Sequence, residues 1–250
     1  PATDMVRAAD VDVDVDVDVD VDRVSPPLIV HGPGGSGKSS FMARVVADMA
    51  RRHPQAVIIT RFVGTTPDST DLITLLRGLL VELARAYDQP EDLPEGNLET
   101  LIQALPERLA WASPDRPLLL ALDALDQFTP MLETGNHRWL PRTLPPCTAL
   151  LLSVLDGPLQ EAAASRFPDA MLVGLPALSH EDGGRLLEAM LLAGHQHVGK
   201  PRRLTPDQRR TVLDAFAQDG RPLYLVLAAG LTRDWRAWEH PDALPPSVEG

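Results

Sequence analysis

The fold of this chain is decided by residues 27–49, which read PLIVHGPGGSGKSSFMARVVADM. Within them, residues 32–39 match the pattern G-x-x-x-x-G-K-[ST] of a phosphate-binding loop, with a short apolar strand before it and a helical pattern after it. Glycines at positions 34, 35 and 37 let the backbone curl so that successive N–H groups point at phosphate oxygens. The helix that follows directs its positive end at the same oxygens. The stretch therefore predicts a strand–loop–helix unit that binds phosphates.

The side chains of this loop have expected roles of their own. Lys38 supplies a positive charge for the β- and γ-phosphates, and Ser39 offers a hydroxyl to Mg²⁺. The alternative is a glycine-rich turn that merely joins a strand to a helix, and the correct flanking pattern argues against it. The residues expected to hold the nucleotide are Gly32, Pro33, Gly34, Gly35, Ser36, Gly37, Lys38, Ser39 and Ser40, with Lys38 also acting in catalysis.

A second informative stretch is residues 117–123, which read PLLLALD. An apolar run that closes on an aspartate places a carboxylate at the carboxyl edge of a buried strand, where ligands bind in open α/β sheets. An acid after a strand is weak evidence alone, but a phosphate loop lies about ninety residues upstream. We therefore expect Asp123 to join Ser39 in the Mg²⁺ site. Asp126 follows three residues later and is expected to orient or deprotonate the attacking water.

Apolar strands alternate with helical patterns as far as Gly174, which indicates an α/β fold: a parallel, three-layer P-loop NTPase sheet with right-handed crossovers. The expected strands are residues 28–30, 56–60 (a second buried strand), 117–123, 148–155 and 171–173. After Gly174 the chain reads as helix upon helix, with an N-cap at Ser179, a capping box over Thr205–Gln208 and a break before Leu223. The expected divisions are an acidic, disordered lead-in (1–25), a nucleotide-binding domain (26–175), a small all-α helical domain (176–236) and a linker or tail (237–250).

Composition narrows the class of protein. The chain has 250 residues, 44% of them hydrophobic, and can bury a substantial core. Its apolar runs are too short to span a bilayer and no signal peptide opens it, so we expect no membrane partner and a cytoplasmic protein. Cys147 is the only cysteine, so it has no partner for an internal disulfide, and no motif around it suggests a nucleophile.

The formal charge of −12 divides unevenly along the chain. Residues 1–23 hold eight Asp and two Arg, so half of the charge lies in a lead-in that contains six consecutive Val-Asp pairs. Low-complexity acidic sequence of this kind is typically disordered, and we expect no Ca²⁺-binding or strand-pairing role for it. The rest is mildly acidic and has no basic stripe, which argues against a nucleic-acid partner.

Four stretches resemble the STAND class of signalling ATPases, most closely the NACHT family. They are the phosphate loop; residues 118–127, which look like that family's apolar-Asp-small-apolar-Asp signature; residues 61–64, followed by a Thr/Ser-rich loop; and residues 220–224, GRPLY, which look like its Gly-x-Pro motif. The resemblance covers about residues 26–236, nearly all of the globular chain.

The resemblance implies a sheet in which another strand separates the Asp123 strand from the phosphate-loop strand. It also implies ATP and ADP as ligands, held between this domain and the helical one, with Pro222 near the base. Slow hydrolysis, a switch from closed monomer to open homo-oligomer, and sensor or effector domains in a longer chain are further implications.

Two departures from the family pattern bear on turnover. Gln127 stands where many relatives have an acid, and Ser153 stands where many have an arginine that senses the γ-phosphate. Possible replacements for that arginine are Arg138, Arg142 and Arg166.

Other functions share parts of the pattern. A small-molecule kinase fits the paired acids and the helical C-terminal domain poorly, and a DNA-handling AAA+ ATPase fits the acidic charge poorly. A binding module that holds nucleotide without hydrolysing it agrees with Gln127 and Ser153. His195 and His197 suggest a metal pair, but they have no third ligand nearby in the sequence, and an exposed pair is the simpler interpretation.

Overall fold

The computed structural model describes residues 25–63, 71–95, 97–127, 138–193, 202–239 and 244–248. Three features of the sequence lie outside these ranges: the acidic lead-in before Ser25, the Thr/Ser-rich loop at 65–70, and the pair His195 and His197.

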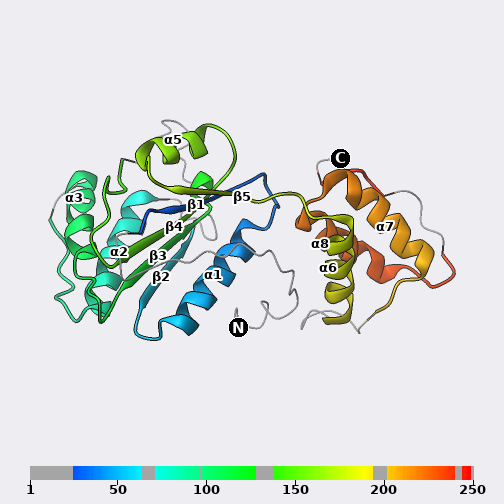
Figure 1. Ribbon diagram of the computed structural model, residues 1–250, viewed down its shortest axis with the longest axis horizontal. Coiled ribbons are helices and arrows are strands. Elements are labelled where there is room, and N and C mark those ends of the chain that lie inside the picture. Colours follow the sequence, from blue (N-terminus) through cyan, green and yellow to red (C-terminus); the bar gives the residue numbers. More distant parts are fainter. Residues whose placement is uncertain are drawn as a thin grey trace. The chain divides into compact units, whose positions relative to one another are not determined.

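Five parallel strands form one sheet in the order β2-β3-β4-β1-β5 (Figure 1). The strands are β1 (Leu28–His31), β2 (Val57–Phe62), β3 (Leu118–Asp123), β4 (Thr148–Val154) and β5 (Met171–Gly174). β4 lies between β3 and β1, so the strand that ends at Asp123 is separated from the phosphate-loop strand, as the family resemblance implied. The predicted three-layer α/β class is confirmed.

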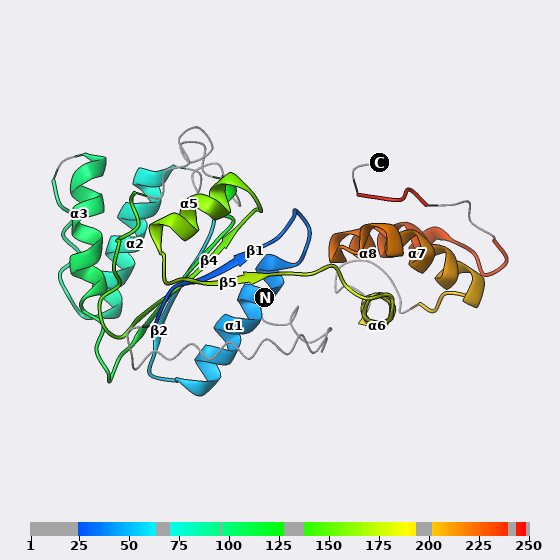
Figure 2. The same cartoon turned by 45° about the horizontal axis from the view of Figure 1, so that its top comes forward.

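Helices cover both faces of the sheet, which explains why its central strands are continuously apolar. On one face, α2 (Leu72–Ala86), α3 (Leu98–Leu109) and α5 (Pro158–Arg166) share a core with alternate strand residues such as Leu120 and Leu152. The intervening residues, among them Leu119, belong to the other face, where α1 (Lys38–Arg52) packs on β3 and β4 (Figure 2). Each leucine buried in this way contributes about 2 kcal/mol of stability.

The two edge strands are less buried than the central ones. β2 was expected to be a buried strand, but Ile59 is its only buried residue. β5, the opposite edge, leaves Met171 and Leu172 exposed. An edge strand has a neighbour on one side only, and the apolar pattern of the sequence does not show which strands those are.

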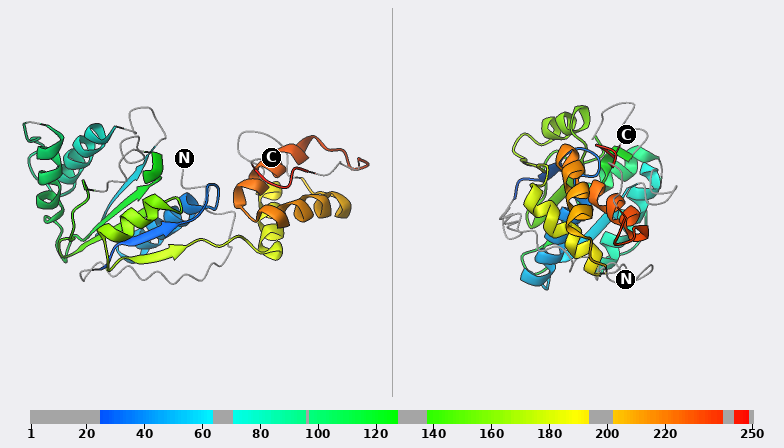
Figure 3. Two further views of the ribbon diagram at one scale, coloured as in Figure 1. Left: turned by 90° about the horizontal axis from the view of Figure 1, so that it is seen from above. Right: turned by 90° about the vertical axis from the view of Figure 1, so that its right-hand side faces the viewer.

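Among the described residues, three α-helices follow the sheet, and they are α6 (His180–Ala193), α7 (Pro206–Asp219) and α8 (Pro222–Leu231). They pack on one another around a second core that includes Phe216 and Leu225 (Figure 3). The predicted capping box is present, because Thr205 accepts from the backbone of Gln208 while the Gln208 side chain accepts from Thr205 N.

The described chain divides into two compact units. The sheet unit contains the residues up to Pro33 and then Lys38–Gly174. The helical unit contains the residues from Leu175 onward together with four residues of the phosphate loop, Gly34–Gly37. Within the described ranges, no helix combines the length and the apolar character needed to cross a membrane.

Candidate functional site

The phosphate loop connects β1 to α1 with backbone angles that favour glycine. Gly35 and Gly37 have φ of +78° and +94°, in the left-handed region that L side chains rarely adopt. Lys38 is the first residue of α1, and Ser39 and Ser40 follow, exposed, in its first turn. That turn carries no acidic side chain, so the positive end of the helix is available to an anion.

Lys38 is turned back onto its own loop. Its ammonium donates hydrogen bonds to the carbonyls of Gly32 (2.8 Å) and Pro33 (3.0 Å). These are neutral acceptors, and they leave the lysine's charge without a direct ion-pair partner among the described residues.

The electrostatic surroundings of Lys38 also favour an anionic ligand. Partial burial lowers the pKa of Lys38, while the carboxylates of Asp126, Asp123 and Asp156 oppose the shift. The structure therefore brings three acids, two from the end of β3 and η3 and one from the segment after β4, into electrostatic reach of one half-buried lysine. An anionic group bound here would pair with the partly buried ammonium of Lys38.

Ser36 is a second, independent observation that fits a phosphate-bearing ligand. Its hydroxyl is buried and finds no hydrogen-bond partner among the described residues. Leaving a buried hydroxyl unpaired costs about 1–3 kcal/mol, and a phosphate oxygen is an acceptor that would satisfy it. The loop residues thus fit a phosphate-bearing ligand.

Asp123 is fixed in place by Ser153, a neighbour on β4. The Ser153 hydroxyl donates to the Asp123 carboxylate and accepts from the backbone N–H of Ala124 (2.9 Å). Asp123 and Ser153 are both buried, and Ala124 adopts a left-handed conformation (φ +57°) that turns the chain directly after the acid. Ser153, noted above as a departure from the family's arginine, therefore serves as the hydrogen-bond partner that orients Asp123.

Asp126 lies in a short 3₁₀ helix, η3 (Leu125–Gln127), and is buried. The side-chain amide of Gln127 donates to its carboxylate at 2.7 Å. Part of the acceptor capacity of Asp126 is therefore already used by the residue that replaces the family's acid.

His31 and Asp156 form a further pair at this edge that the sequence reasoning missed. His31 is the last residue of β1, Asp156 follows β4, and the distance from Nδ1 to the carboxylate is 2.7 Å. A signal was available, because Asp156 closes an apolar strand in the same way as Asp123 does. Only the strand order shows that both acids lie near Lys38.

A metal ion would need ligands beyond the protein at this site. Within the described chain, no three His, Cys, Asp or Glu side chains gather closely enough to hold one. Ser39 and Asp123, the residues expected at Mg²⁺, leave coordination positions for phosphate oxygens and water, which is the usual arrangement for Mg²⁺ in phosphate sites.

The helical unit holds its four loop residues against the start of α8. Leu223 N donates to the Gly35 carbonyl at 3.2 Å, and a Cβ on Gly35 would lie 2.7 Å from that of Leu223, so this position needs glycine. A Cβ on Gly37 would lie 3.6 Å from Cγ of Pro222, the residue expected near the base.

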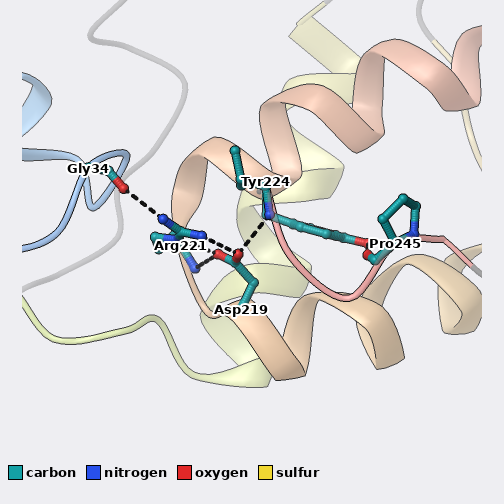
Figure 4. Close-up of polar contacts among 6 residues, drawn as sticks. Gly34, Asp219, Arg221, Tyr224 and Pro245 are labelled. Carbon is teal, nitrogen blue, oxygen red and sulfur yellow. Dashed lines mark hydrogen bonds and ion pairs between the residues drawn. The ribbon is translucent and has the colours of Figure 1, made fainter. Parts of the chain in front are cut away.

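Arg221 adds a hydrogen bond from α8 to the same loop segment. Its guanidinium donates to the Gly34 carbonyl at 3.3 Å and forms two bonds to Asp219, at 2.8 and 2.7 Å (Figure 4). The side chain of Asp219 is only 1% exposed, so this pair is held inside the unit.

The possible replacements for the γ-phosphate arginine are Arg138, Arg142 and Arg166. Arg166 is engaged by backbone carbonyls, donating to Leu140 and to Arg138 (3.2 Å). Arg138 and Arg142 are exposed.

Comparisons with known proteins agree with this geometry. The model of the NACHT domain family matches residues 26–193. Tetratricopeptide repeat protein 41 of Rattus norvegicus is 26% identical over 222 residues, which cover 85% of this chain and 16% of that protein. NACHT domain- and WD repeat-containing protein 1 of Mus musculus is 27% identical over 245 residues, which cover 91% and 15%.

The chain therefore spans about a sixth of the length of these relatives. Among solved structures, the ORC2 protein of Aeropyrum pernix, in ADPNP–ADP complexes, is similar with a TM-score of 0.50 and 17% identity. The similarity covers 82% of this chain and 54% of that one, and it shows a shared fold.

Proposed function

This chain belongs to the NACHT family of P-loop NTPases, and from that premise we propose that it is an adenine-nucleotide switch. In this proposal it binds ATP and ADP, hydrolyses ATP slowly, and couples nucleotide state to a change from closed monomer to open homo-oligomer. The divisions at residues 26–175 and 176–236, a cytoplasmic location, the absence of a nucleic-acid partner, and sensor or effector domains in a longer chain belong to the same proposal.

The observation that carries the proposal is the state of Lys38. Among the described residues, the half-buried Lys38 ammonium bonds to the loop carbonyls of Gly32 and Pro33 and has Asp123 and Asp126 in electrostatic reach. This arrangement supports a site that binds an anion and also attracts a divalent cation. A nucleotide with Mg²⁺ would supply both partners, because its phosphates are anionic and the metal ion is the divalent cation.

Each residue has one proposed part in the reaction. Lys38 and the loop N–H groups hold the β- and γ-phosphates, Ser39 and Asp123 hold the metal, and Asp126 orients the attacking water. A bound Mg²⁺ would neutralise charge on the phosphate oxygens. Pro222, at the start of α8, would contact adenine.

A second candidate function follows from the bond between Gln127 and Asp126 (2.7 Å). An Asp126 carboxylate that already accepts from an amide is a weaker acceptor for a proton from water. The domain could then hold nucleotide as a structural module and not turn it over. Replacing Gln127 by Glu removes the amide donor, and faster phosphate release in that variant would favour this second function for the natural chain.

Binding is tested by calorimetric titration with ATP, ADP and GTP in Mg²⁺. Lys38→Ala should abolish binding, because it removes the charge that faces the phosphates, while the fold stays intact. Arg44→Ala is the matched control, since Arg44 is an exposed cation on the same helix. Wild-type affinity in Lys38→Ala would refute the proposal.

Turnover is tested by phosphate release from the same samples. Asp126→Asn should keep nucleotide affinity and lose release, which separates its role from that of Lys38. Light scattering with ADP and with a non-hydrolysable ATP analogue then tests the switch, and an unchanged mass in both would remove oligomerisation from the proposed function.

A further inference from the structure

Among the described acids that act electrostatically on Lys38, Asp156 has no task in the proposed function. Asp123 is expected at the metal and Asp126 at the water, whereas Asp156 reaches the same lysine from the end of a different strand. β4 ends at Val154, which pairs with His31, so Asp156 follows two residues beyond the register of the phosphate-loop strand.

His31 keeps the Asp156 carboxylate at this edge. A carboxylate can only accept, so at 2.7 Å the Nδ1–H of His31 donates to Asp156. The side chain of His31 is 22% exposed and that of Asp156 51% exposed, so the histidine is the better anchored partner.

The ring of His31 is supported from its other side by β5. A Cβ on Gly174, the residue paired with His31, would lie 3.0 Å from Cε1 and 3.2 Å from Nε2. The imidazole therefore lies over a position that glycine leaves open, between β5 and the segment that follows β4. Three strands of the sheet unit thus fix where the Asp156 charge lies.

This charge acts differently on the two nucleotides. ATP carries about one more negative charge than ADP, and in the proposed function Lys38, which interacts electrostatically with Asp156, binds the additional phosphate. Asp123 would share a bound Mg²⁺ with that phosphate, whereas the proposed function gives Asp156 no metal ligand role. Its effect on the additional phosphate is repulsive.

We propose that Asp156, positioned by His31, is a specificity-determining residue that lowers the affinity of this site for ATP relative to ADP. The inference rests on the proposed nucleotide-binding function. In the resting protein it would favour the ADP-bound state. The preference for ADP would then come from a charge within the sheet unit and would not depend on a further domain.

The test measures dissociation constants of the whole chain for ADP and for a non-hydrolysable ATP analogue, both in Mg²⁺. Asp156→Asn removes the charge and keeps an acceptor for His31, so the affinity for the analogue should rise about tenfold relative to that for ADP. Asp169→Asn is the matched control, because this exposed acid precedes β5 at the opposite edge of the sheet and should leave the ratio unchanged.

The part played by His31 is tested in the same assay. His31→Ala leaves the half-exposed Asp156 carboxylate without its anchor, so the charge can move into solvent and the ratio should shift towards the ATP analogue, by about threefold. His31→Asn keeps a donor near the Nδ1 position and should restore the wild-type ratio. The double variant His31→Ala/Asp156→Asn should have the same affinity ratio as Asp156→Asn alone.

The outcomes separate this inference from the proposed function. If the wild-type chain binds neither nucleotide, both are overturned. If it binds both and Asp156→Asn leaves the ratio unchanged, or weakens the analogue more than ADP, the function stands and the role of Asp156 is overturned.

Discussion

Replacing Ser153 by Ala removes a single hydroxyl that holds two groups at the carboxyl edge of the sheet. Asp123 loses a hydrogen bond to a charged acceptor, worth about 1.5–3 kcal/mol, and the N–H of Ala124 loses its acceptor, which costs about 1–3 kcal/mol. Because the site can relax around the smaller side chain, the total loss of stability is smaller than the sum of these two contributions. We expect Ser153→Ala to lower the free energy of unfolding by about 3 kcal/mol.

Urea denaturation followed by circular dichroism measures this loss, and the thermal midpoint should fall by about 6–12 °C. Thr148→Val is the control at the other end of β4, because Thr148 is equally buried but its hydroxyl donates to a neutral carbonyl, that of Leu109 (3.2 Å). It should cost about 1 kcal/mol. Equal losses in the two variants would refute the account, since the difference rests on the Asp123 charge and the Ala124 N–H.

The remaining predictions concern the helices and acid stability. Gly183→Ala should destabilise the helical unit by about 2 kcal/mol, because the new Cβ would lie 2.2 Å from the buried ring of Phe216. Gly78→Ala on α2 meets nothing within 4 Å and should stabilise the chain by about 0.5–1 kcal/mol; thermal melts of both variants give the two signs. The hydrogen bonds from Arg221 lower the pKa of Asp219, so the stability from this pair is present above about pH 4 and is lost as the pH falls through the lowered pKa. Asp219→Asn should therefore be less stable at pH 7 and lose less stability on acidification, as melts between pH 2 and 7 would show.

Much of the sheet could be predicted from the sequence because its strands carry a strong local signal. Runs such as residues 118–122 of β3 are apolar without interruption, and in an α/β pattern this indicates a buried parallel strand. The helix α5 was not predicted, since its apolar residues do not fall on one clear face. The partial exposure of β2 was also missed, because whether a strand lies at an edge depends on long-range pairing.

The candidate site divides in the same way. The loop from Gly32 to Ser40 has a motif of its own, so its residues could be named directly. Asp156 and His31 have no motif, and they come together only through the pairing of β1 with β4. The hydroxyl of Ser153 was interpreted as the loss of an arginine, because only the register of β3 and β4 places it beside Asp123.

The position of β4 between β1 and β3 has a consequence for how the protein is made. About 120 residues separate the end of β1 from the end of β4, which on a ribosome corresponds to a delay on the order of 10 s. Until β4 has emerged and inserted, β1 and β3 have no strand to join them, and the lysine and the acids that follow these strands stay apart. A nascent chain that stops before Thr148 should therefore not retain nucleotide. Bound nucleotide can stabilise only those molecules in which β4 has already paired with β1 and β3.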